Sequence, residues 1–308
     1  MEGERGDRAD LDGLLAVPSA QAHEREVGGA ADQHAGEPGA LEQEFGAGDE
    51  LAGEHGSPVL LLMGFGMRGL AWQPQVEAFR AHHRVLSFDH AGVGESGPLP
   101  QRFPSMAELA EHAAALADAV GWQRFHLVGV SMGGMMAQHL ALAHRERLLS
   151  LTLVATHAGG RAVLPPAKGL ALFLKLNTTR GPRAAEDFAK LLFPPAFCRE
   201  HPDEARACFP ARGVEPSPVR TRLAHLQAVL RHHTAARLGT LAGVPTLVVR
   251  PGQDILIAPR ESDRLARLIP GAEILRFDEA GHGVLWQCRD AVNAGLLAFF
   301  ARSESVAS

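Results

Sequence analysis

One serine of this chain has neighbours that could make it a nucleophile. Ser131 stands between two glycines in Gly129-Val130-Ser131-Met132-Gly133, where an apolar run gives way to a helical pattern. A serine in a sharp turn between a strand and a helix presents its hydroxyl above the sheet, and flanking glycines prevent side-chain collisions there. The amide end of the following helix stabilises negative charge that develops nearby. The spacing therefore predicts the nucleophile of an acyl-transfer enzyme.

A nucleophilic serine needs a base to remove its proton, and the base needs a carboxylate to orient it. In a parallel sheet that carries such a turn, the order along the chain is serine, acid, histidine, each after a later strand. Asp254 and His282 each follow such a predicted strand. Asp278 is a rival acid, but it lies in the same loop as His282. We therefore predict a triad of Ser131, Asp254 and His282.

The elements that must position these residues alternate along the chain. Short apolar runs predict buried strands at 59–63, 84–88, 125–130, 149–155, 246–249 and 273–277. Helical patterns lie at 71–80, 105–120, 132–144, 260–268 and 291–300, and Ser105 with Glu108 predicts a capping box for the second of these. This alternation indicates a mostly parallel, doubly wound α/β sheet. Chemistry in such sheets lies beyond the carboxyl ends of the strands, where all three triad candidates fall.

A long segment after the strand that ends near Ala155 interrupts this alternation. It contains Pro165-Pro166 and Pro194-Pro195, with helical stretches between them. About 80 residues is too long for a bare loop in a compact domain. We predict that residues 158–240 form a helical lid over the strand ends, and that 57–157 together with 241–308 form the core.

The first 56 residues differ in composition from the rest. Fourteen acidic and three basic residues give them a charge of −11, whereas the other residues carry +6, and they include eleven glycines. Such a segment buries too little apolar surface to offset chain entropy, so we expect residues 1–56 to be disordered and order to begin at Pro58. Met1 to Glu4 is acidic where a signal peptide is basic. A genuine acidic tail and a misassigned coding start both stay open.

Composition narrows the function classes. The chain has 308 residues and a formal net charge of −5, so no basic excess favours nucleic acid as a partner. No apolar run approaches the roughly 18 residues that a membrane span needs. Three cysteines, Cys198, Cys208 and Cys288, form neither a disulfide framework nor a zinc spacing. We expect a cytoplasmic protein that acts on a small molecule without a metal or another cofactor.

Taken together, these motifs resemble the α/β-hydrolase fold family, over residues 58–157 and 241–302. The matching features are the Ser131 turn, Asp254 after its strand, Gly281-His282, and Asp89-x-x-Gly92-x-Gly94-x-Ser96. Ser131-Met132-Gly133-Gly134 is especially similar to the esterase, enol-lactonase and cofactor-free haloperoxidase branch. The resemblance implies that the lid is the family's cap and that the Asp89 motif shapes a turn rather than performing chemistry.

The chain departs from the family pattern at three places. Where the family has His-Gly-x-Gly after the first central strand, this chain has Met63-Gly64-Phe65-Gly66. The resemblance implies that the backbone amides of Phe65 and Met132 form the oxyanion hole. Pro251 replaces a glycine three residues before Asp254, and residues 1–56 contain no pattern like the two antiparallel strands that precede this loop in the family.

A rival interpretation uses the same glycines. Gly64-x-Gly66-x-x-Gly69, with Asp89 twenty residues later, matches the spacing of a dinucleotide-binding fingerprint and would indicate an NAD(P)-dependent oxidoreductase. Pro74 falls early in the helix that this fingerprint requires. A hydrolase fold used only for binding is a third alternative. The interpretation that uses all three triad residues is a serine hydrolase of esters, thioesters or lactones of small, mainly apolar molecules, through an acyl-enzyme.

Overall fold

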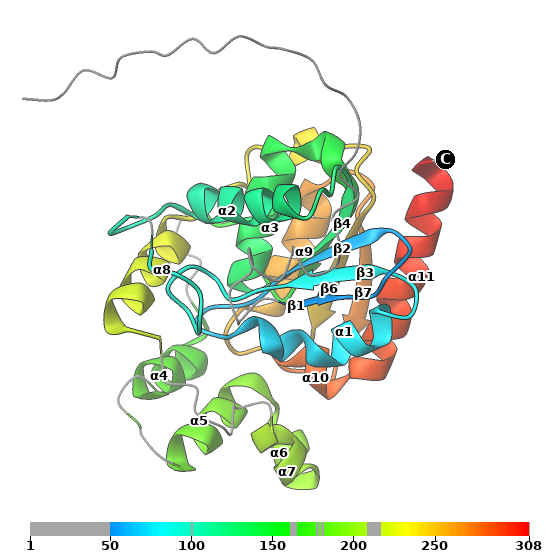
Figure 1. Cartoon of the computed structure of the whole chain (residues 1–308). Coiled ribbons are helices and arrows are strands. Elements are labelled where there is room, and N and C mark those ends of the chain that lie inside the picture. Colours follow the sequence, from blue (N-terminus) through cyan, green and yellow to red (C-terminus); the bar gives the residue numbers. More distant parts are fainter. Residues whose placement is uncertain are drawn as a thin grey trace, which may run out of the picture. The chain divides into compact units, whose positions relative to one another are not determined.

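A seven-stranded β-sheet forms the centre of the protein (Figure 1). The computed structural model describes residues 50–99, 101–160, 165–176, 179, 182–207 and 217–307. The strands are β1 (Glu50–Ala52), β2 (Pro58–Leu62), β3 (Arg84–Ser87), β4 (Phe125–Val130), β5 (Leu148–Val154), β6 (Thr246–Pro251) and β7 (Glu273–Phe277). Their order is β1-β3-β2-β4-β5-β6-β7, and every neighbouring pair except β1 and β3 is parallel. The predicted α/β class and mostly parallel sheet are confirmed.

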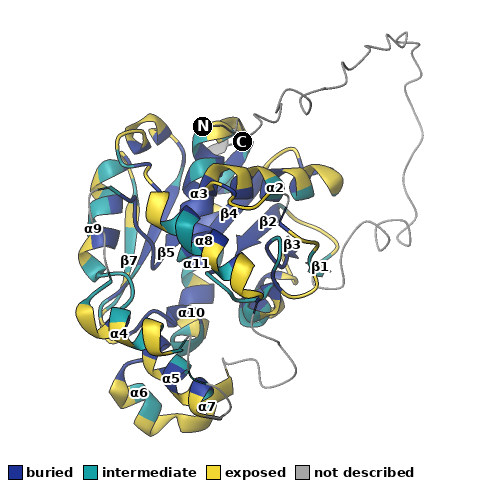
Figure 2. Cartoon of the chain, turned by 90° about the vertical axis from the view of Figure 1, so that its left-hand side faces the viewer, coloured by how far each residue is buried: buried dark blue, intermediate teal, exposed yellow. Residues whose placement is uncertain are grey.

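Helices cover both faces of the sheet, because each strand turns alternate side chains to opposite sides. Leu60 and Leu62 of β2 face the layer of α2, α3 and α9, whereas Val59 and Leu61 face the layer of α1, α10 and α11. Figure 2 shows these strands as buried, with the outer surfaces of the helices exposed. The helices of the two layers are α1 (Gln73–Phe79), α2 (Met106–Ala119), α3 (Met132–Ala143), α9 (Pro259–Leu268), α10 (Val284–Gln287) and α11 (Arg289–Ala307).

Short 3-10 turns and a capped helix complete the core. The turns are η2 (Gly69–Trp72), η3 (Arg145–Arg147) and η4 (Leu238–Leu241). Helix α2 begins at the predicted capping box, in which the Ser105 side chain accepts from the Glu108 amide at 3.2 Å and Glu108 accepts from the Ser105 amide at 2.7 Å. No helix in the described part of the chain is long and apolar enough to cross a membrane.

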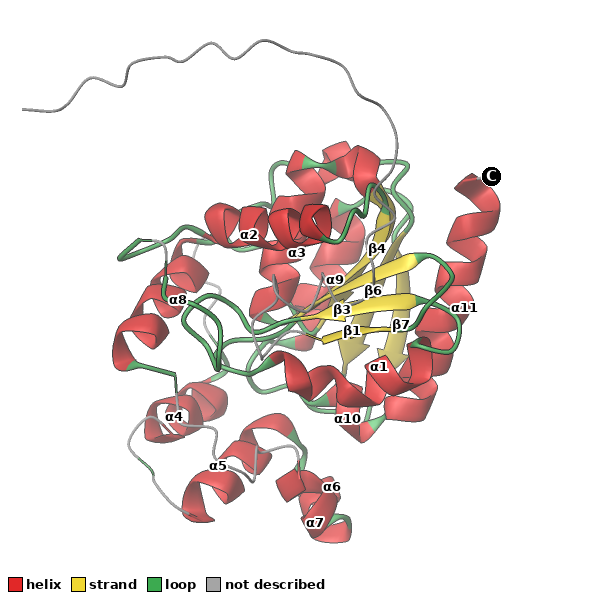
Figure 3. Cartoon of the chain, in the orientation of Figure 1, coloured by secondary structure: helices red, strands yellow, loops and turns green. Residues whose placement is uncertain are grey.

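Five helices of the described part lie between β5 and β6, where the sequence predicts a lid (Figure 3). They are α4 (Ala167–Leu176), α5 (Pro182–Leu192), α6 (Pro195–Glu200), α7 (Pro202–Ala207) and α8 (Val219–Arg231). Helix α5 contacts α4, α6 and α7, whereas α8 packs against α2 of the core. Leu192, Phe193 and Ala205 give the group its own small apolar cluster. The division of the chain into core and lid at 158 and 240 stays a prediction.

The edge strand β1 corrects one expectation. Glu50–Ala52 pairs antiparallel with β3, with Leu51 opposite Leu86, so order does not begin only at Pro58. The pairing uses backbone groups, and three residues are too few to show an alternating pattern. At Gly53, which follows β1 with φ of 82°, a Cβ atom would lie 2.1 Å from the His83 carbonyl oxygen, so only glycine fits this turn. Residues 1–49 of the acidic segment, and Cys208, lie outside the described residues.

Candidate active site

Ser131 occupies a strained turn between β4 and α3. Its backbone has φ of 53° and ψ of −117°, a conformation that costs a non-glycine residue about 1–3 kcal/mol. Two hydrogen bonds hold it there: the Ser131 amide donates to the Val154 carbonyl at 2.9 Å, and the Thr156 hydroxyl donates to the Ser131 carbonyl at 2.7 Å. The strain and its supports fix the serine at the carboxyl end of β4, as the sequence predicts.

The glycines around Ser131 allow the strand and the helix to approach each other closely. A Cβ atom at Gly129 would lie 2.3 Å from the Gly133 carbonyl oxygen, and one at Gly133 would lie 2.0 Å from the Leu62 carbonyl oxygen. Both distances are far shorter than any van der Waals contact, so no other residue fits either position without moving the backbone. These two glycines are therefore required by packing as well as by the turn.

Asp254 and His282 lie in contact at the ends of two neighbouring strands. The Nδ1 atom of His282 is 2.7 Å from Oδ2 of Asp254, and the Asp254 side chain is inaccessible to solvent. Because a carboxylate oxygen accepts, Nδ1 carries a proton, and in the neutral ring Nε2 then has a lone pair that can accept one. The other carboxylate oxygen, Oδ1, accepts the amides of Leu256 at 2.7 Å and Ile257 at 2.9 Å.

A backbone hydrogen bond joins the acid loop to the histidine loop, since the Gln253 amide donates to the Ala280 carbonyl at 2.8 Å. Within the histidine loop, the Gly281 amide donates to the Gln287 side chain at 3.0 Å. The rival acid Asp278 is exposed and pairs with Arg250 at 3.2 Å. The structure therefore pairs His282 with Asp254 and leaves Asp278 outside the site.

The Ser131 and His282 side chains are not hydrogen-bonded to each other. Among the described residues, the Ser131 hydroxyl makes no hydrogen bond to His282 or to any other group. Such catalytic hydrogen bonds are often long in the absence of substrate and tighten when it binds. The structure thus brings Asp254 and His282 together, whereas Ser131 lies at the end of β4, which β5 separates from β6 in the sheet.

The loop after β2 lies against Ser131. A Cβ atom at Gly64 would lie 3.4 Å from the Cβ atom of Ser131, which places the following residue, Phe65, beside the serine. In the described part of the chain, neither the Phe65 amide nor the Met132 amide donates to a protein acceptor. Two free backbone donors next to a serine are what an oxyanion hole requires.

His90 supports this loop, and sequence reasoning missed it. Its Nε2 donates to the Met63 carbonyl at 2.7 Å, directly before Gly64. Burial lowers the pKa of His90, so the ring stays neutral and keeps the hydrogen bond. The family's histidine is replaced by Met63 in this chain, and His90 holds the same loop from the neighbouring strand end. No local spacing connects the two residues, which are 27 positions apart.

Asp89 shapes the turn, as the resemblance implies. Its carboxylate accepts from Arg68 Nε at 2.9 Å, from the Gly69 amide at 2.7 Å and from the Glu95 amide at 3.2 Å. The dinucleotide alternative needs this carboxylate free to bind a ribose, and a long helix that begins after Gly69. Here the carboxylate is committed, and Gly69 begins the four-residue turn η2. The structure gives that alternative no support.

Side chains of helices α4 and α8 contact Phe65, the residue that follows Gly64. The Phe65 ring contacts Phe173 of α4 with 5.7 Å between centroids and His225 of α8 with 6.4 Å between centroids. His225 is buried, and burial lowers its pKa to about 4, so this ring is also neutral. Helix α8 approaches the loop after β3 closely, because a Cβ atom at Gly92 would lie 2.7 Å from the Thr221 hydroxyl. The two side chains that contact the Phe65 ring, Phe173 and His225, are therefore aromatic and uncharged.

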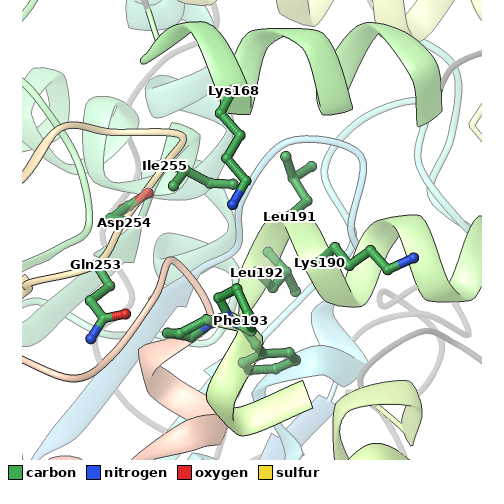
Figure 4. Close-up of a pocket in the computed structure, with 10 residues that line it drawn as sticks. Lys168, Lys190, Leu191, Leu192, Phe193, Gln253, Asp254 and Ile255 are labelled. Atoms are coloured by element: carbon green, nitrogen blue, oxygen red, sulfur yellow. The ribbon is translucent and has the colours of Figure 1, made fainter. Parts of the chain in front are cut away.

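A cavity of about 270 Å³ opens between α4, α5 and the acid loop (Figure 4). Figure 4 shows Lys168 reaching from α4 toward the acid loop, whereas Lys190 points away. Apart from these lysines the walls are largely apolar, and the cavity touches Asp254 but not Ser131. Its lining residues are Lys168, Lys190, Leu191, Leu192, Phe193, Pro194, Pro195, Gln253, Asp254 and Ile255.

The solvent exposure of two pairs of adjacent histidines differs from what their sequence pattern indicates. The sequence suggests that the pairs His82-His83 and His232-His233 are solvated, but His83 is only 7% exposed and His232 only 4%. His82 and His233 are exposed, so the prediction is wrong for one member of each pair. Met132, Met135 and Met136, in the first turns of α3 after Ser131, are all buried.

Comparison with known proteins identifies the family. The profile of the alpha/beta hydrolase fold matches residues 57–287 of the chain. The chain therefore belongs to the α/β-hydrolase fold family, and it is a hydrolase enzyme.

Its relatives include enzymes of several specificities. A protein from Azorhizobium caulinodans, provisionally named carbamate hydrolase RutD, is 33% identical over 251 residues, which cover 79% of this chain and 91% of the relative. The malate-bound structure of a thermophilic esterase from Thermogutta terrifontis has a TM-score of 0.70 and 26% identity, and covers 83% of this chain and 93% of that one. Est816, an N-acyl homoserine lactone degrading enzyme, has a TM-score of 0.66 and 26% identity, with coverage of 82% and 95%.

Proposed function

We propose that this hydrolase is a serine esterase that cleaves an ester, thioester or lactone of a small, mainly apolar molecule through an acyl-enzyme. The observation that carries the proposal is the buried Asp254–His282 pair, 2.7 Å between Oδ2 and Nδ1, together with a strained serine at the carboxyl end of β4 in the same sheet. The ring contact between Phe65 and Phe173 and the apolar cavity walls support an apolar substrate. The esterase and lactone-degrading relatives support the bond type.

In the proposed reaction, the Ser131 hydroxyl attacks the substrate carbonyl carbon and its proton moves to Nε2 of His282. The carbonyl oxygen becomes an oxyanion that accepts the Phe65 and Met132 amides, each worth about 3–4 kcal/mol of transition-state stabilisation. The tetrahedral intermediate then breaks its bond to the leaving oxygen or sulfur, which takes the proton from His282. Asp254 holds the imidazole in the required tautomer throughout.

The second half repeats these steps with water. His282 removes a proton from a water molecule, whose oxygen attacks the acyl carbon attached to Ser131. The Ser131 oxygen leaves and regains the proton from Nε2, which releases the carboxylic acid and restores the enzyme. No cofactor enters either half.

A hydrolysis assay with p-nitrophenyl esters of increasing acyl length tests the proposal. Ser131→Ala is expected to reduce kcat about 10⁶-fold with an unchanged circular dichroism spectrum. Ser303→Ala, which removes a buried hydroxyl of α11, serves as the matched control and should retain full activity. A Ser131→Ala enzyme that hydrolyses every ester at the wild-type rate would refute the mechanism.

The lid is proposed to select the substrate. Helices α4 and α5 form the cavity beside the acid loop, and Lys168 is a cationic group in its wall. The ester panel should therefore include one substrate with a remote carboxylate. It should also include a carbamate, because one relative is named as a carbamate hydrolase.

We also place the protein in the cytoplasm, which the free thiols of Cys198 and Cys288 support. Fractionation of the source cells tests that location.

A further inference from the structure

A cluster of metal-ligating side chains lies at the amino end of the sheet strands, opposite the end that carries Ser131. His83 directly precedes β3, His126 is the second residue of β4, and Glu304 lies in the last turns of α11. Helix α11 lies along the sheet (Figure 1), and its Phe300 ring stacks on His126 with 4.5 Å between centroids. The fold thus joins three distant parts of the chain at one place.

The potential ligand atoms of these three side chains are close together. One ring nitrogen of each histidine and one carboxylate oxygen of Glu304 all lie within 4.8 Å of one another. Nε2 of His126 is already 3.2 Å from Oε1 of Glu304. Tetrahedral zinc, with bonds of about 2.0–2.2 Å, sets its ligand atoms about 3.4 Å apart. One ligand pair has that spacing already, and the other pairs, which are at most 4.8 Å apart, need to close by at most about 1.4 Å.

Neighbouring hydroxyl groups orient the two imidazoles. Nδ1 of His126 lies 2.8 Å from the Ser150 hydroxyl, which leaves Nε2, the nitrogen beside Glu304, as its ligand atom. Nδ1 of His83 lies 2.9 Å from the Ser57 hydroxyl, and within the described part Nε2 of His83 makes no hydrogen bond. The Ser57 hydroxyl also hydrogen-bonds Glu304. Hydrogen bonds to the other ring nitrogen fix the ring orientation of histidine ligands in metal sites.

We propose that His83, His126 and Glu304 bind one divalent transition-metal ion of the zinc class, which fastens α11 to the sheet. Two imidazoles and one carboxylate suit zinc, cobalt or nickel, whereas calcium and magnesium prefer oxygen ligands alone. The Glu304 side chain is 40% exposed, which gives an ion a route in and gives this ligand freedom to adjust. Without an ion, the same groups form a hydrogen-bonded network, so the fold does not depend on the metal.

The alternative is that the cluster is only this network, and metal titration of the full-length enzyme separates the two. The protein is first stripped with EDTA and dialysed, and then titrated with Co²⁺ by visible absorption and with Zn²⁺ by calorimetry. The proposal predicts one bound equivalent and a Co²⁺ spectrum of low-symmetry coordination. Saturating Zn²⁺ should raise Tm by about 5 °C or more.

Two variants assign the site. Glu304→Gln keeps an acceptor for Ser57 and His126, and His83→Asn removes the imidazole; each should weaken Zn²⁺ binding at least tenfold. The matched controls are His82→Asn, the exposed neighbour, and Glu273→Gln, which removes another carboxylate that contacts α11. Both controls should bind within twofold of the wild type.

Absence of a bound equivalent at Zn²⁺ concentrations of about 100 µM, or equal affinity in the wild type and both ligand variants, would overturn the proposal. Binding and Tm are read independently of ester hydrolysis, so the result stands whether or not the serine mechanism holds.

Discussion

Replacing the acid of the pair with its amide tests how the base is oriented. In Asp254→Asn, the side-chain oxygen should stay with the two backbone amides that Oδ1 now accepts, from Leu256 at 2.7 Å and Ile257 at 2.9 Å. The new NH₂ group then faces Nδ1 of His282 at the position of Oδ2, 2.7 Å away. Because NH₂ can only donate, Nδ1 must become the acceptor and the proton must move to Nε2. A ring with a proton on Nε2 cannot take one from Ser131.

The magnitude follows from that change of tautomer. In a serine triad, the wrong tautomer lowers kcat about 10³- to 10⁴-fold, which corresponds to about 4–5.5 kcal/mol of barrier. Because the amide fills the same space and keeps two of the three hydrogen bonds, KM should change less than threefold and Tm only slightly.

Steady-state hydrolysis of a p-nitrophenyl ester measures the effect, and the same substitution at the exposed Asp278 is the control. Asp278→Asn should retain activity within twofold, since that carboxylate only pairs with Arg250 on the surface. Activity above one tenth of the wild type in Asp254→Asn, or an equal loss in Asp278→Asn, would refute the assignment of the acid.

Two further predictions concern stability. Gly133→Ala places a Cβ atom 2.0 Å from the last carbonyl oxygen of β2, and it should lower the free energy of unfolding by about 2–3 kcal/mol in urea melts. The control Gly97→Ala has open space around its Cβ position, so it should change the free energy of unfolding by less than about 0.5 kcal/mol. Burial lowers the pKa of His157 to about 4 and that of His232 to about 3, so between pH 6.5 and pH 4 the unfolded chain binds protons that the folded protein does not. The free energy of unfolding should therefore fall as pH falls from 7 to 5, by about 2 kcal/mol for each histidine. A flat stability between these pH values would contradict the neutral, buried state of the two rings.

The sequence predicted those parts of the fold that leave a local pattern. Buried parallel strands such as Val59 to Leu62 appear as continuous apolar runs, and the Ser131 turn needs glycines at fixed offsets. By contrast, β1 forms through three backbone pairs and has no side-chain signature. The closing helix was predicted at 291–300 but extends from Arg289 to Ala307. Its last turns are polar, and they are held by side-chain bonds such as that of Ser303 to the Phe299 carbonyl.

Contacts between side chains that are distant in sequence leave no local pattern, so they could not be predicted from the sequence. His90 hydrogen-bonds the Met63 carbonyl from the end of the adjacent strand, and the ring of His225 in α8 contacts Phe65. The strand order that joins them is set by packing, not by any motif in either segment. For the same reason, Asp254 and His282 could be paired in advance only because their positions after successive strands placed both at one edge of the sheet.

The central claim is that Ser131 is a nucleophile activated by His282. Intact-protein mass spectrometry after treatment with a fluorophosphonate ester tests it most directly. We predict one covalent adduct, located on the peptide that contains Ser131, with no adduct in Ser131→Ala and a strongly slowed reaction in Asp254→Asn. An unmodified wild-type protein, or an adduct that persists in Ser131→Ala, would contradict the claim.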